Sequence, residues 1–247
     1  MLIPSQVHHN YCHHESLSVL PDSFGLICWN VYKKNRLNDR FRSFMQKEIE
    51  KKKIDFLLFQ EASFKADRPC LFEGFAFDAA ANIEYRRSFY GVLTASRTVS
   101  KEARAFLSES KEAFFATRKS FLLTNYRYED GSELLIVNIH AINFRENRSY
   151  NKETDRLLEL LSVHTGPMIV AGDFNTWNQK RVTKLSAIRK ALGLAMVPYG
   201  KDESVKSMFG NHLDFIFYRG LELLAYEVLE EDGISDHNPL FARFRKK

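Results

Sequence analysis

The chain has 247 residues, 45% of them hydrophobic and 13% aromatic, which is enough for one sizeable core in a single large domain. Lys and Arg outnumber Asp and Glu by 36 to 31, so the formal net charge is +5. This balance favours a polyanionic partner, either nucleic acid or an anionic membrane surface. Stable membrane insertion is excluded, because charged residues interrupt every apolar stretch well short of the roughly 20 residues that span a bilayer.

Cysteine usage and the first residues of the chain bear on its compartment and domain layout. Cys12, Cys28 and Cys70 show no CxxC spacing, which indicates neither a disulfide framework nor a structural zinc site and favours a reducing, cytoplasmic compartment. Residues 1–24 lack Lys, Arg and a signal-peptide apolar run, so we expect an N-terminal arm followed by one domain over residues 25–247. The arm also offers an alternative metal-binding tract: His8, His9, Cys12, His13 and His14.

Two early apolar runs predict buried strands that end in polar side chains. Leu26–Val31 presents Asn30 near its exit, and Ile54–Gln60 ends beside Glu61. Each side chain fits an ordinary solvated loop. However, a carboxylate at a buried strand end must be solvated, hydrogen-bonded or bound to a cation, and an amide oxygen can ligate the same hard cation.

Helical periodicity appears in three places. Asn38 or Asp39 is predicted to cap a helix that reaches about Lys52. Its apolar face contains Phe41, Phe44, Met45 and Ile49. Two further helices are predicted over Lys152–His164 and Lys180–Leu192, each followed by a glycine.

The middle of the chain predicts strands at Tyr90–Ala95 and Ser120–Tyr126, separated by a charged, exposed region at Ser100–Lys111. Arg118 and Lys119 precede the second of these strands. With Phe114 and Phe115 they form a basic and aromatic cluster suited to backbone phosphates and a stacked base. Core aromatic residues beside solvated charges explain the same pattern.

The next strand, Leu134–His140, places Asn138 and His140 on one face because strand side chains alternate. A single histidine in a strand is usually a satisfied core residue. Paired with an asparagine at the end of an apolar strand, it becomes a candidate phosphate ligand or general acid.

The run Met168–Ala171 predicts a buried strand that leads through Gly172 to Asp173 and Asn175. If the extended geometry continues, both polar side chains project to the same side. The carboxylate can orient a water molecule or bind a cation, while the amide can donate to a phosphoryl oxygen. An ordinary turn uses the same residue types.

Leu213–Tyr218 predicts a strand that contains Asp214, and a buried aspartate is costly unless it is paired. We predict His237 as its partner, because the tripeptide Ser235-Asp236-His237 precedes the final strand at about Leu240–Phe244. An aspartate that orients an imidazole is the usual arrangement for a general base.

The candidate polar residues share one position, at or beside the ends of predicted strands. They are Asn30, Glu61, Asn138, His140, Asp173, Asn175, Asp214, Asp236 and His237. Acids, amides and histidines together suit metal-assisted phosphodiester hydrolysis, which needs a cation, an activated water and donors for the phosphoryl oxygens.

Short motifs in this order over residues 26–244 resemble the endonuclease/exonuclease/phosphatase superfamily. They are Trp29-Asn30, Gln60-Glu61, Asn138 to His140, Gly172 to Asn175, Leu213 to Phe217 and Ser235 to His237. More narrowly, CWNVYK, VNIHAINF, AGDFNTWN, LDFIFYRG and SDHNPL resemble the bacterial YafD-like branch. The resemblance implies a DNase I-like α/β fold, a four-layer sandwich of two mixed sheets with helices outside, and a catalytic domain over residues 25–247.

The same resemblance implies a role for each candidate residue. Glu61 would bind Mg²⁺, or Mn²⁺, with help from Asn30 and Asp236, and Asp173 would orient the attacking water. Asn138 and Asn175 would hold the phosphate. His237, polarised by Asp214, would be a base or a transition-state stabiliser, and His140 an acid or a phosphate donor. The presence of His140 disfavours apurinic-site endonucleases, which usually lack a histidine there.

The resemblance therefore implies a divalent-metal-dependent phosphodiester hydrolase. We expect a nuclease that acts on DNA or RNA with little sequence selectivity, through a basic rim formed by Arg118, Lys119, Lys180 and Arg181. One alternative is a phosphodiesterase or phosphatase for lipid headgroups or small phosphoesters. A catalytically silent binding module is a second alternative, against which the intact acids and histidines argue. No protein partner is indicated.

Overall fold

The computed structural model describes residues 7–10, 18–35, 38–65, 72–108, 118–141, 147–200, 204–231 and 233–247. Several positions used in the predictions lie outside these ranges: Cys12, His13, His14, Cys70, Phe114 and Phe115. The proposed metal-binding tract is therefore only partly within the described residues, and the aromatic half of the basic cluster lies outside them.

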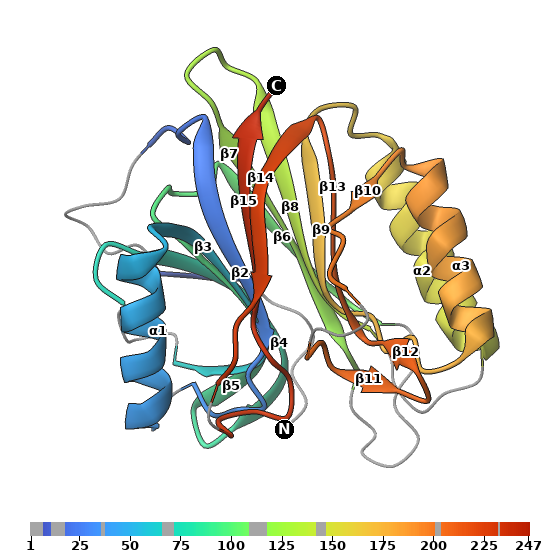
Figure 1. Cartoon of the computed structure of the whole chain (residues 1–247), viewed down its shortest axis with the longest axis horizontal. Helices are drawn as coiled ribbons and strands as arrows, with labels where there is room; N and C mark the ends of the chain where they lie inside the picture. Colours follow the sequence, from blue (N-terminus) through green and yellow to red (C-terminus); the bar gives the residue numbers. More distant parts are fainter. Residues whose placement is uncertain are drawn as a thin grey trace.

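Two mixed β-sheets pack face to face, and helices cover their outer faces (Figure 1). Across the first sheet the strands are β1 (Val7–Asn10), β4 (Ala76–Tyr85), β5 (Ser88–Ser96), β3 (Ile54–Phe64), β2 (Ser23–Asn30), β15 (Leu240–Lys246) and β14 (Leu221–Val228). Across the second they are β10 (Ala195–Met196), β13 (Asp214–Arg219), β9 (Met168–Asp173), β8 (Glu133–His140), β7 (Ser120–Arg127) and β6 (Glu102–Leu107). The predicted four-layer α/β sandwich is confirmed.

The helices are α1 (Asp39–Lys51), α2 (Asn147–Ser162) and α3 (Gln179–Ala191). Helix α1 packs on the first sheet, and α2 and α3 lie side by side on the second (Figure 1). The predicted cap of α1 is confirmed, because the side chain of Asn38 accepts a hydrogen bond from the Phe41 backbone N–H. No helix among the described residues is long and apolar enough to span a membrane.

Strand β2 shows why the central runs are apolar on both faces. Ile27 and Trp29 pack under α1, whereas Leu26 and Cys28 lie between the two sheets. A strand that is covered on both sides cannot alternate polar with apolar residues. Its polar side chain, Asn30, comes only at the last position of the strand.

The region Ser100–Lys111, predicted to be charged and exposed, contains a strand in its first part. Glu102–Leu107 forms β6, an edge strand that pairs antiparallel with β7. An edge strand tolerates charges because one of its sides faces solvent. Its alternating exposed and half-buried residues therefore conceal a strand from a search for apolar runs.

The predicted arm also contributes to the sheet. Val7–Asn10 pairs antiparallel with β4, and His9 Nδ1 lies 2.5 Å from Asp78 Oδ1. Strand β2 begins at Ser23, two residues before the expected start of the domain at residue 25.

Gly172 permits a close approach between β9 and β8. It has a φ of +144°, and a Cβ at this position would lie 2.0 Å from the backbone oxygen of Ile139. No L side chain fits either the torsion or the space. The glycine therefore fixes how Asp173 leaves the strand.

Gly172→Ala should lower the free energy of unfolding by roughly 3 to 5 kcal/mol, because torsional strain and overpacking add. The matched control is Gly193→Ala, since Gly193 has a φ of +64° but an added Cβ there would meet none of the described atoms within 4 Å. That change should cost about 1 to 2 kcal/mol. Urea unfolding measures both, and equal losses would contradict the close approach.

Candidate active site

The register of three neighbouring strands brings three titratable side chains together. Parallel pairing of β8 with β9 sets His140 opposite Asp173, and antiparallel pairing of β9 with β13 sets Asp173 opposite Asp214. Directly opposite residues have Cβ atoms roughly 5 Å apart. The strand pairing alone therefore creates an acidic site with an imidazole at its side.

Asp173 is buried and held by hydrogen bonds from two directions. Its Oδ1 accepts from the Asn175 backbone N–H at 3.0 Å, and its Oδ2 accepts from Asn30 Nδ2 at 3.1 Å. Asn175 has a φ of +50°, and its side-chain Nδ2 donates to the Ala141 carbonyl at 2.9 Å. Because Asn30 belongs to the first sheet and Asp173 to the second, the site bridges the two sheets.

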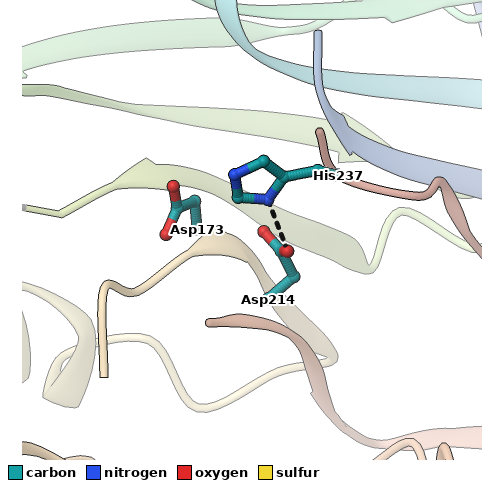
Figure 2. A group of neighbouring side chains, drawn as sticks. All are labelled: Asp173, Asp214 and His237. Atoms are coloured by element: carbon teal, nitrogen blue, oxygen red, sulfur yellow. Dashed lines mark hydrogen bonds and ion pairs between the residues drawn. The ribbon is translucent and has the colours of Figure 1, made fainter. Parts of the chain in front are cut away.

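The predicted pairing of Asp214 with His237 is present. Asp214 Oδ2 and His237 Nδ1 are 2.7 Å apart, and Asp173 lies beside the same imidazole (Figure 2). The backbone around His237 is fixed as well, because Trp29 Nε1 donates to its carbonyl at 2.7 Å. Ser235 Oγ donates to the carbonyl of Asn30 at 2.7 Å, which ties this loop to the end of β2.

The acids and His237 shift one another's pKa values. Burial lowers the pKa of His237, but the charges of Asp214, Asp173 and Asp236 and the hydrogen bond to Asp214 outweigh it and raise this pKa to about 9. Burial and the neighbouring Asp214 charge raise the pKa of Asp173 to about 7. Two buried carboxylates around one imidazole leave an excess of negative charge.

Glu61 was predicted to lie at the end of a strand, but it lies within β3. The pairing of β3 with β5 shifts between Phe59 and Ala62, and Glu61 has a φ of +50°. Such a bulge places an extra residue in the strand and redirects its side chain, and bulges are common next to active sites. The carboxylate still lies near the site, because Glu61 Oε1 is 3.7 Å from His140 Nε2.

His140 differs from His237 in its electrostatic surroundings. Burial lowers its pKa well below the ordinary value, and the charges of Lys119, His237 and Lys33 act in the same direction. Lys119 Nζ lies 3.0 Å from His140 Nε2 and 3.8 Å from Glu61 Oε1. Lys119 therefore turns into the site rather than lying on a rim.

Asn138 is not placed to bind phosphate. It is fully buried between the sheets, where Gln60 Nε2 donates to its Oδ1 at 2.7 Å. Its Nδ2 contacts the Leu93 carbonyl at 3.0 Å, together with Phe59 O and Thr94 Oγ1. Both ends of its amide serve the packing of the two sheets, so the predicted phosphate contact is wrong for this residue.

Two other candidates have their hydrogen-bond partners outside the group of Asp173, Asp214 and His237. Asp236 is 57% exposed and its Oδ2 accepts from Lys206 Nζ at 3.0 Å, although its Oδ1 lies 3.9 Å from His237 Nε2. The guanidinium of Arg118 donates to the Ser108 carbonyl at 3.2 Å.

Arg181 is fully buried, so its predicted place on a basic rim is wrong. Its Nη1 donates to the Asn175 carbonyl at 2.9 Å, and its guanidinium lies over the rings of Tyr150 and Trp177. It shares the buried face of α3 with Leu185 and Ile188, four and seven residues later. This helical spacing could have indicated from the sequence that Arg181 lies on the buried face of α3, where it supports the turn at Asn175.

The donor atoms fit a hard divalent cation. Within the described part of the chain, Asp214 Oδ1 is buried without a hydrogen-bond partner, and the carboxylate of Glu61 has its charged neighbours only at 3.7 to 3.8 Å. Among the described residues, Asp173, Asp214 and His237 form a group whose ligand atoms lie within 4.8 Å of one another. Carboxylate and amide oxygens suit Mg²⁺ or Mn²⁺.

Comparisons with known proteins identify the family of the chain. Residues 27–237 match the Endonuclease/Exonuclease/phosphatase family. A UPF0294 protein of Vibrio cholerae is 35% identical over 229 residues, which cover 92% of this chain and 79% of the relative.

Two solved structures share the fold at low sequence identity. An endonuclease/exonuclease/phosphatase family protein from Bacteroides thetaiotaomicron matches with a TM-score of 0.73 and 17% identity, covering 92% of this chain and 99% of that protein. A mannosyl-6-phosphatase from the same species gives a TM-score of 0.68 and 18% identity, covering 90% and 99%. With motifs, fold and matched residues in agreement, the chain belongs to the endonuclease/exonuclease/phosphatase family.

Proposed function

We propose that this protein is a divalent-metal-dependent phosphodiesterase that cleaves nucleic acid with little sequence selectivity. The observation that carries the proposal is the hydrogen-bonded pair of Asp214 and His237 beside the buried carboxylate of Asp173. An oriented imidazole and an adjacent carboxylate are the groups needed to activate a water molecule and to stabilise a phosphoryl transition state.

In this proposal Asp173 orients the attacking water and accepts its proton. Asn30 and the Asn175 backbone N–H hold the carboxylate in place. His237, kept in one orientation by Asp214, donates a hydrogen bond from Nε2 to a phosphoryl oxygen. Since Asp214, Asp173 and Asp236 together outweigh burial and raise the pKa of His237 to about 9, the imidazole is available as a charged donor near neutral pH.

Glu61 and Asn30 are the proposed cation ligands. Among the described residues, Asn30 Oδ1 accepts only from the Tyr32 backbone N–H, at 3.2 Å, so a second lone pair is available. When bound, Mg²⁺ or Mn²⁺ would neutralise charge on the phosphoryl oxygens. We leave Asp236 out of the ligand set because Lys206 already balances its charge.

The basic balance of the chain supports a nucleic-acid substrate. Lys33 and Lys119 flank Glu61, and Lys180 is exposed in the first turn of α3, beyond the turn that holds Asn175. These ammonium groups suit a polyphosphate backbone rather than base recognition. One structural relative is named a phosphatase. Hydrolysis of a phosphomonoester, without cleavage of nucleic acid, would therefore contradict this proposal most directly.

Removal of the cation should abolish turnover. Excess EDTA should reduce hydrolysis of a single-stranded oligonucleotide to background, and added Mg²⁺ or Mn²⁺ should restore it. Glu61→Gln should lower kcat/KM at limiting Mg²⁺ and should raise the Mg²⁺ concentration needed for half-maximal rate. Unchanged activity in EDTA would rule out the proposed metal dependence.

Asp173→Asn and His237→Ala should each lower kcat by at least about a hundredfold while the fold is retained. Asp214→Asn should have a smaller effect because it orients rather than reacts. Asp155→Asn is the matched control, since Asp155 is exposed on α2 and pairs with Lys184. Steady-state kinetics and circular dichroism test the series, and near-normal turnover of His237→Ala would refute the pairing's role.

Binding of nucleic acid should weaken with salt, with a log-log slope of roughly 0.7 to 0.9 for each phosphate contact. Lys180→Gln should reduce the magnitude of this slope by the contribution of about one phosphate contact. Lys190→Gln is the control, because Lys190 is exposed at the other end of the same helix, about 15 Å away at 1.5 Å per residue. Fluorescence anisotropy over a salt series measures both, and equal slopes for the two variants would remove α3 from the binding surface.

A further inference from the structure

A short hairpin next to the site carries an unusually exposed aromatic ring. Strands β11 (Ser207–Met208) and β12 (Asn211–His212) pair antiparallel around Phe209 and Gly210. Phe209 is 83% exposed, more than any other large hydrophobic side chain among the described residues. An exposed phenyl ring contributes no stabilisation from burial, so packing in the core does not explain its presence.

The backbone at this tip adds a second cost. Phe209 has a φ of +52° and Gly210 a φ of +77°. Two-residue hairpin turns with positive φ at both positions favour Asn-Gly, and a bulky residue there is an outlier. Phe209 is therefore both strained and exposed, which points to a role in contacting another molecule.

The hairpin is fixed to the strands that carry the site. Leu213 N donates to the Lys206 carbonyl at 2.9 Å, and Phe174 N donates to the Leu213 carbonyl at 2.8 Å. Thr176 Oγ1 donates to the His212 carbonyl at 2.5 Å. Figure 1 shows the hairpin at the lower end of the sandwich, where β9 ends and β13 begins. The ring is thus held at a set position relative to Asp173 and Asp214.

The surroundings of the ring favour a nucleobase over a membrane. Among its neighbours in the hairpin, Ser207, Gly210 and Asn211 are polar or lack a side chain, and Met208 is the one other apolar residue, half-buried. Lys206 at the base of the hairpin pairs with Asp236 beside His237. A membrane-binding loop needs several exposed apolar residues together, whereas one ring matches the face of one base.

We propose that Phe209 stacks on an unpaired base of the substrate strand, next to the phosphodiester held at the site. This inference rests on the proposed function and narrows its substrate to single-stranded or locally unpaired nucleic acid. Bases inside a duplex are covered on both faces by their neighbours, so their rings are not available to the side chain without flipping. The contact is independent of sequence because every base has a π-face.

The test compares Phe209→Ala and Phe209→Trp in the full-length protein, with Val163→Ala as the control. Val163 is 79% exposed but precedes β9, at the opposite end of that strand from Asp173. The dissociation constant is measured by anisotropy for a single-stranded oligonucleotide and for the same backbone with abasic tetrahydrofuran residues. Hydrolysis of methyl p-nitrophenyl phosphate with Mg²⁺ reports separately whether the phosphodiesterase chemistry exists.

For the oligonucleotide, Phe209→Ala should raise the dissociation constant roughly 5- to 150-fold, whereas Phe209→Trp and Val163→Ala should leave it near the wild-type value. On the abasic strand, wild type and Phe209→Ala should bind equally, because no base remains to stack. An equal loss on both strands, no loss on either, or no binding of the oligonucleotide would overturn the inference. So would a loss confined to anionic phosphatidylserine vesicles. Failure of the small diester to react with Mg²⁺ would instead overturn the proposed function.

Discussion

The site depends on the hydrogen bond from Asn30 to Asp173, because this contact joins the ends of two strands that belong to different sheets. Each sheet supplies only part of the chemistry. The first provides Asn30, Glu61 and the loop that carries His237, and the second provides His140, Asp173 and Asp214. The apolar packing between the sheets therefore does more than stabilise the fold, since it sets the distance between the residues proposed to bind the cation and those proposed to transfer the proton.

Electrostatics explain why these groups need one another. Asp173 and Asp214 lie directly opposite across β9 and β13, an arrangement that is unfavourable for two buried carboxylates. His237 offsets part of this charge through its 2.7 Å contact with Asp214, and its own pKa rises in response. Burial, together with the charge of Lys119, lowers the pKa of His140. Burial lowers the pKa of both histidines, but only His237 has neighbouring carboxylates whose charges outweigh it.

Sequence patterns predicted what short-range rules control. Apolar runs located the central strands, the cap at Asn38 located α1, and a buried aspartate in β13 required a partner that proved to be His237. Sequence patterns failed where tertiary packing determines the position of a side chain. Asn138 shares a strand face with His140, but two positions deeper it lies fully between the sheets. The bulge at Glu61 and the inward turn of Arg181 depend on neighbouring strands and rings that one-dimensional patterns do not contain.

The most direct test of the account is a crystal structure with Mn²⁺ and a non-hydrolysable phosphorothioate dinucleotide. The account predicts anomalous density for Mn²⁺ bound by the Glu61 carboxylate and the Asn30 amide oxygen, and a phosphoryl oxygen within hydrogen-bond distance of His237 Nε2. Asp173 should face the phosphorus from the side opposite the leaving oxygen. Phosphate bound elsewhere, or a metal held without Glu61, would contradict the assignment of this sheet edge as the catalytic centre.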